Sequence, residues 1–503
     1  MRRRARLLTQ VVARLAVREL PGGGRAAQEG QGRTHERVVE IRRALERLGP
    51  LYIKMGQILS TRPDLVPPSL AKELENLHDR VPVVPFGSMA GVLAEELGAG
   101  WAADFAEFDR GAPLGTASLA QAYRAVLHDG RAVVVKVQRP GIQAVLRDDM
   151  RLLRFAARTV GKGAPVFSAS MDVDAMLGVV FEAMRSELDF TQEAANMDQA
   201  RGDAERFPGI EVPHVLHATP RVLIQSMAPG TSIRDADPTA FKDEEKAAIG
   251  TQLLAFMYRG YFVSGTFHAD PHPGNVFVCP GGPTTVIDWG MVGRVDRRMR
   301  TSLVQVLLGL ARNDGQTVAR AWGDMGRPTP WADFPGFEQD MAVMVPRIAA
   351  ASLERLNFGS SLGAVLAHST QRGIQTSPMI ALLGKSFANI EGSVRYLAPQ
   401  LSVTDVFTEQ MRTIVFAYAR EAVSEEQLVQ SFMELFTASQ TAVGDLRSIV
   451  HSLATGSMTV QTNAVQRKLS LVENRMDARL RHGVRTLIAA VAVGWWAAHR
   501  RTP

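Results

Sequence analysis

The stretch that decides the fold runs from His268 to Asn275 and reads His-Ala-Asp-Pro-His-Pro-Gly-Asn. Asp270 and Asn275 are five residues apart, and Asp288 follows thirteen residues after Asn275 in the strand-turn sequence Thr-Thr-Val-Ile-Asp-Trp-Gly. Phosphoryl transfer needs such groups, because a metal ion bridges the phosphate oxygens while another carboxylate orients the acceptor. We therefore predict that Asp288 and Asn275 bind Mg²⁺ and that Asp270 faces the γ-phosphate of ATP.

The same stretch has two simpler interpretations. Each residue alone is more typical of a turn or a helix cap, because Asp and Asn favour both. Together, HxDxxxxN and an apolar strand ending in Asp-Trp-Gly are typical of a kinase catalytic loop, in which His268 would brace the loop. His268 and His272 also have the i, i+4 spacing of a zinc pair, but Pro271 and Pro273 disfavour the helix that this spacing requires. The pattern favours Mg²⁺ and phosphate over zinc.

Lys136 ends the apolar run Ala-Val-Val-Val-Lys and has strand character, like the lysine that contacts the α- and β-phosphates in kinases. A lysine at a strand end is usually solvated, so its position upstream of the other motifs is what favours a phosphate role. The loop before it lies where a glycine-rich phosphate loop belongs, although Gly115 is its single glycine. Thr116, Ala117 and Ser118 have small side chains that still let the backbone approach a nucleotide closely.

Hydrophobic spacing predicts the order of the secondary structure. Apolar residues recur every three or four positions over 33–98, which predicts helices. Short β-branched runs with turn residues over 105–138 predict a small antiparallel sheet. Helical periodicity returns over 142–198 and dominates from 241 onward, while 22–32 is expected to be a flexible linker. We predict an α+β, two-lobed protein-kinase-like fold with an N-terminal helical extension and C-terminal helices.

The expected domains follow from these shifts in pattern. Residues 1–104 would form the helical extension, and 105–230 the N-lobe with a helical insert. Residues 231–440 would form the C-lobe. Residues 441–503 would form C-terminal helices that include a membrane anchor.

Composition sets broader bounds on the 503 residues. Cys279 is the single cysteine, which excludes an internal disulfide framework and suits a reducing compartment. The formal net charge of +6 and the isoelectric point near 9.6 favour anionic partners, without choosing among phosphates, acidic lipids and nucleic acid.

Both ends of the chain have features of a membrane surface. Residues 1–20 are arginine-rich and amphipathic and lack the apolar core of a secretory signal; an organellar transit peptide is the alternative. The apolar run 486–498 would reach about 20 Å as a helix, short of the roughly 30 Å hydrocarbon core. Trp495 and Trp496 beside arginines suit an interface, which favours a monotopic or short, bilayer-thinning anchor over a terminal helix packed on the protein or on a partner chain.

In this order, the motifs resemble those of the UbiB/AarF (ADCK-type) atypical kinases, over about Leu51 to Gly290. The segment Lys54-Met55-Gly56-Gln57 is similar to the family's KxGQ motif. The segment GTASLAQ, from Gly115 to Gln121, is similar to its alanine-rich loop, and Glu187-Leu188-Asp189 matches its ExD motif. Gly115 and Thr116 stand where many relatives have alanine.

The resemblance implies roles that the residues alone do not indicate. Glu193 is implied to pair with Lys136 and to orient it. The N-terminal extension is implied to lie across the site where protein substrates would bind, with its KxGQ motif facing the nucleotide. The residues implied to shape this occluded pocket are Lys54, Gln57, Glu187 and Asp189.

The resemblance also implies an ATP-binding protein with slow ATPase activity that supports isoprenoid quinone biosynthesis or lipid handling. The expected partners are nucleotide, a membrane surface, lipid or quinone precursors and quinone-biosynthesis proteins, and no nucleic acid is expected. The expected location is the cytoplasmic side of a membrane, peripheral or anchored through the C-terminus; the alternative is cytoplasmic. Two other functions stay open. One is a small-molecule phosphotransferase of the aminoglycoside or choline kinase type, which has a similar HxDxxxxN and Ile-Asp-Trp pattern; the other is a nucleotide-sensing membrane scaffold.

Overall fold

The computed structural model describes residues 4, 6, 30–60, 66, 68–74, 76–77, 82–163, 177–178, 180–181, 184–185, 187–350 and 358–422. The chain forms two compact units, one up to Thr404 and one that begins at Asp405 and contains most of α16 (Val403–Ala422). The predicted anchor at 486–498, the border at 440 and most of the basic segment 1–20 lie outside the described residues. No helix in the described ranges is both long enough and apolar enough to cross a bilayer.

Three helices form the N-terminal extension: α2 (Gly30–Leu48), α3 (Pro50–Ser60) and α4 (Pro68–Leu74). Helix α2 begins at Gly30, so the prediction of a flexible linker over 22–32 is wrong at its last three residues. Gly49 separates α2 from α3 with φ +102°, a conformation that glycine adopts without penalty, and Pro50 then begins α3. Leu51 and Tyr52 are buried in one apolar cluster with residues of α6 (Ile142–Gly163).

Gly56 sets how closely the helices of the extension approach one another. A Cβ atom at this position would lie 2.3 Å from Leu77 Cδ1 and 2.9 Å from Leu45 Cδ1. Any larger residue would therefore push α3 away from its neighbours. The glycine of the Lys54-Met55-Gly56-Gln57 motif thus has a packing reason that the sequence pattern alone did not reveal.

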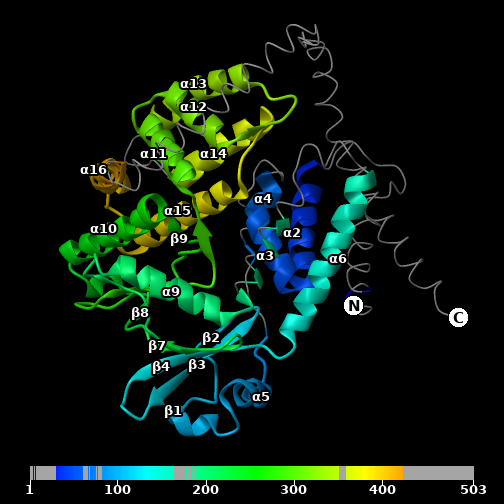
Figure 1. The fold of residues 1–503 in the computed structure, drawn as a ribbon, viewed down its shortest axis with the longest axis vertical. Coiled ribbons are helices and arrows are strands. Elements are labelled where there is room, and N and C mark those ends of the chain that lie inside the picture. Colours follow the sequence, from blue (N-terminus) through cyan, green and yellow to red (C-terminus); the bar gives the residue numbers. More distant parts are fainter. Residues whose placement is uncertain are drawn as a thin grey trace, which may run out of the picture. The chain divides into compact units, whose positions relative to one another are not determined.

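The N-lobe contains an antiparallel sheet, as the sequence predicts. Within the described residues this sheet has six strands in the order β1-β3-β4-β7-β6, with β2 paired to β3. The strands are β1 (Phe105–Phe108), β2 (Gly115–Thr116), β3 (Ala120–Leu127), β4 (Ala132–Gln138), β6 (Val215–Ala218) and β7 (Val222–Ser226). Helix α5 (Phe86–Leu97) packs on β4 and β7, and η1 (Trp101–Asp104) leads into β1 (Figure 1).

Strand β4 positions a functional side chain by its alternation. Val133, Val135 and Val137 are fully buried against α5, and each contributes about 1.5–3 kcal/mol of hydrophobic stabilisation. Successive side chains of a strand point to opposite faces, so Lys136 lies on the other face of the sheet. The apolar alternation of β4 therefore decides where Lys136 points.

A second set of short strands lies around the loop that contains Asp270 and Asn275. Strands β9 (Thr266–His268) and β12 (Val292–Arg294) pair antiparallel on either side of it. Strands β10 (Val276–Val278) and β11 (Thr284–Val286) also pair, in a sheet with β5 (Ile210–Glu211) and β8 (Thr231–Ser232). The predicted loop flanked by short strands is confirmed.

Helices make up most of the remaining described chain. They are α9 (Phe190–Ala204), η2 (Pro238–Ala240), α10 (Asp243–Arg259), η3 (Gly260–Ser264), α11 (Arg297–Ala311), α12 (Gly315–Met325), α13 (Phe334–Ala350), α14 (Phe358–Gln371) and α15 (Pro378–Leu397). Strands β13 (Arg327–Pro328) and β14 (Ile374–Gln375) form a small ribbon among them. Helix α15 packs against α10, α14 and β12 (Figure 1). The two-lobed α+β kinase-like fold predicted from the sequence is confirmed.

Candidate active site

Lys136 lies between two carboxylates that come from different parts of the chain. Its Nζ donates to Glu193 Oε1 at 2.5 Å and to Asp288 Oδ1 at 3.0 Å. Glu193 is in the first turn of α9, where its side chain is 3% exposed, whereas the side chain of Asp288 is 54% exposed. The structure thus brings together the strand lysine, its predicted partner and the predicted metal ligand.

The charges in this cluster perturb one another. Burial by itself would lower the pKa of Lys136, but Asp288 and Glu193 raise it overall. Lys136 is the main cause of the pKa of Asp288 lying below its ordinary value. Burial raises the pKa of Glu193, against the opposing effect of Lys136. We infer that Lys136 is charged and Asp288 is ionised at neutral pH.

The backbone at Asp288 is turned sharply to face Lys136. Its φ is +65°, in the left-handed region that Asp and Asn tolerate better than most residues. Strand β11 ends at Val286, and after Ile287 this turn brings the Asp288 carboxylate to the cluster. A left-handed non-glycine residue costs about 1 kcal/mol. Such strain is typical of functional positions.

The KxGQ and ExD motifs meet in an ion pair between Lys54 and Glu187. Glu187 also lies close to the Lys136 cluster. A Cβ atom on Gly290 would lie 3.8 Å from Glu187 Cγ, 3.8 Å from Glu193 Oε2 and 3.9 Å from Asp288 Oδ1. The three acidic side chains therefore surround one glycine.

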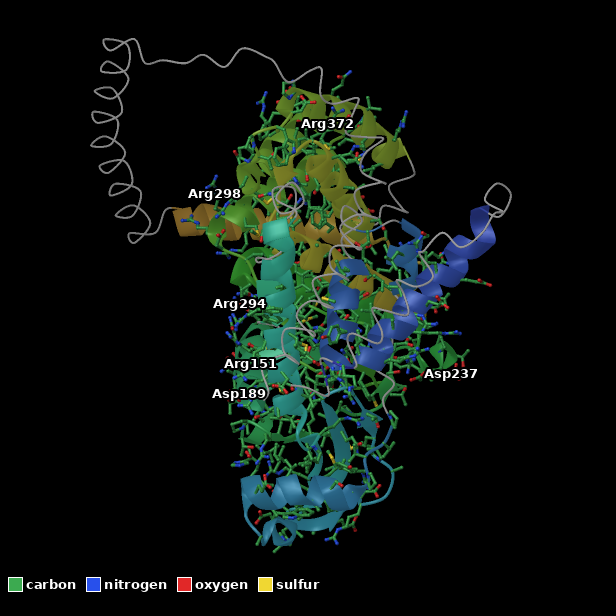
Figure 2. All side chains as sticks on the ribbon, turned by 90° about the vertical axis from the view of Figure 1, so that its right-hand side faces the viewer. Arg151, Asp189, Asp237, Arg294, Arg298 and Arg372 are labelled. Atoms are coloured by element: carbon green, nitrogen blue, oxygen red, sulfur yellow. The ribbon has the colours of Figure 1, made fainter. Side chains whose placement is uncertain are left out.

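Gln57 and Asp189 make other contacts. Gln57 Nε2 donates to Leu77 O at 3.3 Å, within the N-terminal extension. Asp189, labelled in Figure 2, caps α9 and accepts from Thr191 N at 3.0 Å and from Thr191 Oγ1 at 2.6 Å. Neither side chain hydrogen-bonds to the catalytic carboxylates in the described part of the chain. Their predicted pocket roles stay predictions.

His268 is fixed by hydrogen bonds from both ring nitrogens. Nε2 lies 3.0 Å from Ile287 O, and Nδ1 accepts from Asp270 N at 3.1 Å, which assigns the proton to Nε2. Burial lowers the pKa of His268, so the ring is neutral. The Trp289 ring meets it edge-on, with centroids 4.9 Å apart. The buried histidine therefore links the catalytic loop to the turn at Asp288, as a brace would.

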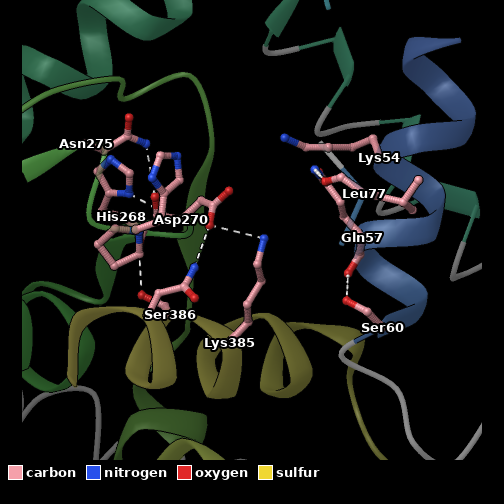
Figure 3. Close-up of polar contacts among 12 residues, drawn as sticks. Lys54, Gln57, Ser60, Leu77, His268, Asp270, Asn275, Lys385 and Ser386 are labelled. Carbon is pink, nitrogen blue, oxygen red and sulfur yellow. Dashed lines mark hydrogen bonds and ion pairs between the residues drawn. The ribbon is translucent and has the colours of Figure 1, made fainter. Parts of the chain in front are cut away.

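Asp270 and Asn275 are in contact with each other beside His268 (Figure 3). Asn275 Nδ2 donates to Asp270 O at 3.1 Å, which turns the side-chain oxygen of Asn275 away from that contact. Burial would raise the pKa of Asp270, but Lys385, His272 and Lys54 lower it overall. Asp270 is therefore ionised at neutral pH.

Two contacts of Asp270 come from α15 and were not anticipated from the sequence. Asn389 Nδ2 donates to Asp270 Oδ1 at 2.6 Å, and Lys385 Nζ lies 3.1 Å from the same oxygen. Ser386 and Ser393 on the same helix hydrogen-bond to carbonyls of the catalytic loop. The signal available in the sequence is a set of polar residues spaced three and four apart within an otherwise apolar helix.

The loop from Gly115 to Ser118 is closed on itself. Gly115 and Thr116 form β2, and Ala117 N donates to Ala120 O at 2.9 Å in a tight turn. Arg139 Nε donates to Ala117 O at 3.0 Å and holds the turn from outside. The amide of Ala117 is thus already used, which distinguishes this loop from one whose amides all cradle phosphates.

The donor set fits Mg²⁺ and a nucleotide. Hard oxygen donors suit Mg²⁺, which keeps several waters and phosphate oxygens among its ligands and needs only one or two protein carboxylates. Asp288 Oδ and the side-chain oxygen of Asn275 are such donors, and Lys136 beside Asp288 supplies a cation for phosphate. No cluster of three or more His, Cys, Asp or Glu that could hold a metal occurs in the described ranges. Both ring nitrogens of His268 are used in contacts with the backbone.

Comparison with known proteins identifies the family of this chain. The ABC1 atypical kinase-like domain model matches residues 76–322. The chain is 30% identical over 477 residues to the "Probable protein kinase UbiB" of Marinobacter nauticus, which covers 90% of this chain and 84% of that protein. It is 34% identical over 375 residues to the protein of the same name from Azotobacter vinelandii, which covers 73% of this chain and 69% of that protein.

The fold also occurs in a protein of known structure. The Mycobacterium tuberculosis protein Rv3197, solved in complex with erythromycin, superposes with a TM-score of 0.50 at 24% identity, covering 71% of this chain and 90% of that one. The chain therefore belongs to the ABC1 atypical kinase-like family, the family of the UbiB/AarF atypical kinases.

Proposed function

We propose that this protein is an Mg²⁺-dependent ATPase of the atypical kinase type that supports isoprenoid quinone biosynthesis, of the ubiquinone type, or lipid handling at a membrane. The observation that carries the ATPase proposal is Lys136 held between Glu193 and Asp288, with Asp270 and Asn275 on the loop that precedes Asp288. The quinone proposal rests on membership of the UbiB/AarF family. The membrane proposal rests on the basic residues 1–20 and the apolar run 486–498.

Each residue has a distinct role in this proposal. Lys136 holds the α- and β-phosphates, and Glu193 orients Lys136 through the 2.5 Å hydrogen bond. Asp288 and Asn275 hold Mg²⁺, which when bound neutralises charge that develops on the phosphates. Asp270 accepts a hydrogen bond from the attacking water or hydroxyl and orients it. Because the pKa of Asp270 is lowered, it acts mainly by positioning and polarising, which suits slow turnover.

The N-terminal extension supports an ATPase rather than an ordinary protein kinase. Lys54 on α3 pairs with Glu187, and Lys54 also lowers the pKa of Asp270 and Asp288 through its charge. A helix that contributes charge to the catalytic carboxylates restricts the approach of a large protein acceptor. The family resemblance of the Lys54-Met55-Gly56-Gln57 motif supports the same conclusion.

The direct test is nucleotide binding and turnover by the purified full chain. We expect Mg²⁺ with ATP to raise the melting temperature by ~5 °C or more at saturating nucleotide, and slow ADP release to depend on Mg²⁺. Asp288→Asn should abolish both effects. Asp237→Asn makes the same chemical change at an exposed residue that caps η2, and should leave both unchanged. No Mg²⁺-dependent binding in the wild type would overturn the proposal.

The products separate the remaining functions. Stoichiometric ADP release with a phosphorylated alcohol would favour a small-molecule phosphotransferase. Full function in cells of an Asp270→Ala variant that still binds ATP would favour a nucleotide-sensing scaffold. Vesicle flotation of the full chain with anionic lipids tests the membrane partner.

The quinone proposal needs a cellular test. Cells that lack the protein and cells that carry Asp288→Asn should accumulate the same quinone intermediate. Unchanged quinone profiles in both would remove the quinone link and leave the nucleotide chemistry intact.

A further inference from the structure

One oxygen of the Asp270 carboxylate receives two donors from a single helix. Asn389 Nδ2 donates to Asp270 Oδ1 at 2.6 Å, and Lys385 Nζ lies 3.1 Å from that atom (Figure 3). Lys385 and Asn389 are four residues apart on α15, so they lie on one face of the helix. In the part of the chain that the structure describes, no group hydrogen-bonds to Oδ2.

Helix α15 is firmly attached to the catalytic loop beyond these two donors. Ser386 Oγ donates to His268 O at 2.6 Å, and Ser393 Oγ donates to Pro271 O at 2.9 Å. Both serines are fully buried. The Phe387 ring stacks on Tyr261 at 4.3 Å, and the Tyr261 hydroxyl lies 2.7 Å from Ser386 Oγ. The helix is thus a rigid support, which a positioning contact requires.

Asp270 needs such a support because the carboxylate torsion of aspartate is broad. The torsion about the bond to an sp² carboxyl carbon has no narrow staggered wells, so the group rotates unless other groups fix it. Two donors that converge on Oδ1 stop this rotation. They also leave Oδ2 as the oxygen that can accept a hydrogen bond from an attacking group.

We propose that Lys385 and Asn389 are positioning residues that hold Asp270 by one oxygen and so select the oxygen that faces the attacking water or hydroxyl. The proposal deepens the proposed ATP turnover and rests on it. Lys385 and Asn389 act through Asp270 and need not touch the nucleotide. Loss of either donor should therefore slow turnover more than it weakens nucleotide binding.

The test compares four variants of the full chain in steady-state ATP hydrolysis. Lys385→Met and Asn389→Leu keep the approximate side-chain size but remove the donors, and each should lower kcat about 10- to 100-fold. The KM for Mg²⁺-ATP should stay within about twofold, because binding does not depend on Asp270 orientation. Lys385→Arg keeps a donor and should recover most of the lost kcat. Gly392→Ala is the control on the same helix, since an added Cβ there meets no atom within 4 Å, and it should match the wild type.

A second measurement does not depend on turnover. In a double-mutant cycle of melting temperatures, the shifts of Lys385→Met and Asp270→Asn should be non-additive by ~2 °C or more, because the residues are in contact. Additive shifts, or an unchanged kcat in both donor variants, would overturn the proposal. A wild type without Mg²⁺-dependent hydrolysis would overturn the proposed function instead, while the cycle would still decide whether Lys385 holds Asp270.

Discussion

Around Lys136 one ammonium group contacts two carboxylates, whereas around Asp270 one carboxylate oxygen is contacted by two donors. Lys136 is shared by Glu193, which is buried, and by Asp288, whose side chain is 54% exposed. Asp270 is held by Lys385 and Asn389 from one helix. Asp288, the exposed partner of Lys136, can give up this contact when a ligand binds, whereas Asp270 keeps its contacts with Lys385 and Asn389. The first cluster is suited to binding and the second to orientation.

The largest effect is expected where the shared ammonium group is removed. Lys136→Met should lower Mg²⁺-ATP turnover about 10²- to 10³-fold, equivalent to ~3–4 kcal/mol, because the phosphates lose their cation. Steady-state ADP release measures this. Lys246→Met is the control, since Lys246 pairs with the exposed Asp243 away from the site. Equal turnover in wild type and Lys136→Met would show that the Lys136 cluster does not bind the nucleotide.

The next effect concerns a buried acid on α15. Glu391 is fully buried, and burial raises its pKa from 4.5 to about 8. The folded protein therefore favours the protonated form of Glu391. The stability that the protonated acid contributes is fully present below about pH 4.5 and is lost as the pH rises through 8. The difference between the unfolded and the folded pKa of Glu391 limits this loss of unfolding free energy to ~5 kcal/mol. We expect about half of it, because neighbouring groups relax around a buried charge.

Glu391→Gln tests this dependence. The amide stays neutral, so at pH 9 the variant should be more stable than the wild type by about 2–3 kcal/mol, and its stability should change little between pH 5 and 9. Chemical denaturation at several pH values measures it. A wild type whose stability does not fall over this range would contradict the prediction and would mean that α15 tolerates a buried charge.

A smaller effect is expected at the cap of α9, the helix that carries Glu193. Asp189→Ala removes the acceptor of Thr191 N and should cost ~1 kcal/mol of unfolding free energy. Asp189→Asn can still cap and should cost little. If turnover falls equally in both variants, Asp189 has the pocket role that the family motif implies. If turnover falls only in step with stability, its role is capping.

The smallest effect is expected in the loop before β3. Gly115 has no neighbour within 4 Å of an added Cβ and no positive φ, so Gly115→Ala should change the unfolding free energy by less than ~0.5 kcal/mol. Denaturant midpoints of the two proteins check this. A larger loss would mean that the loop changes conformation in a way that needs glycine.

The meeting of Lys136, Glu193 and Asp288 could be predicted from the sequence because each belongs to a motif in a fixed order. The alternation of Val133, Val135 and Val137 further explains why Lys136 faces Glu193. The same holds for His268, whose neutral ring and contact with Ile287 fit a bracing role. Local pattern and chain order carried these predictions.

The donors on α15 could not be found in this way. Lys385 and Asn389 are typical of a solvated helix face, and their contact with Asp270 depends on how α15 packs more than a hundred residues later in the chain. Gln57 and Asp189 show the opposite difficulty. Each belongs to a motif, yet Gln57 donates to Leu77 O within the N-terminal extension, and Asp189 accepts from Thr191 because a local donor competes with distant ones.

The left-handed backbone of Asp288 also determines which substitutions can remove the proposed activity without disturbing the fold. At φ +65° the residues accommodated with least strain are Asp, Asn and Gly. Two of these three carry no charge, so a single substitution can remove the proposed metal ligand and still keep the turn after β11, in which Ile287 O contacts His268. A copy of this fold that has lost its chemistry would be expected to carry Asn or Gly at this position while remaining well folded. The turn at Asp288 therefore allows the fold to be kept when the proposed activity is lost.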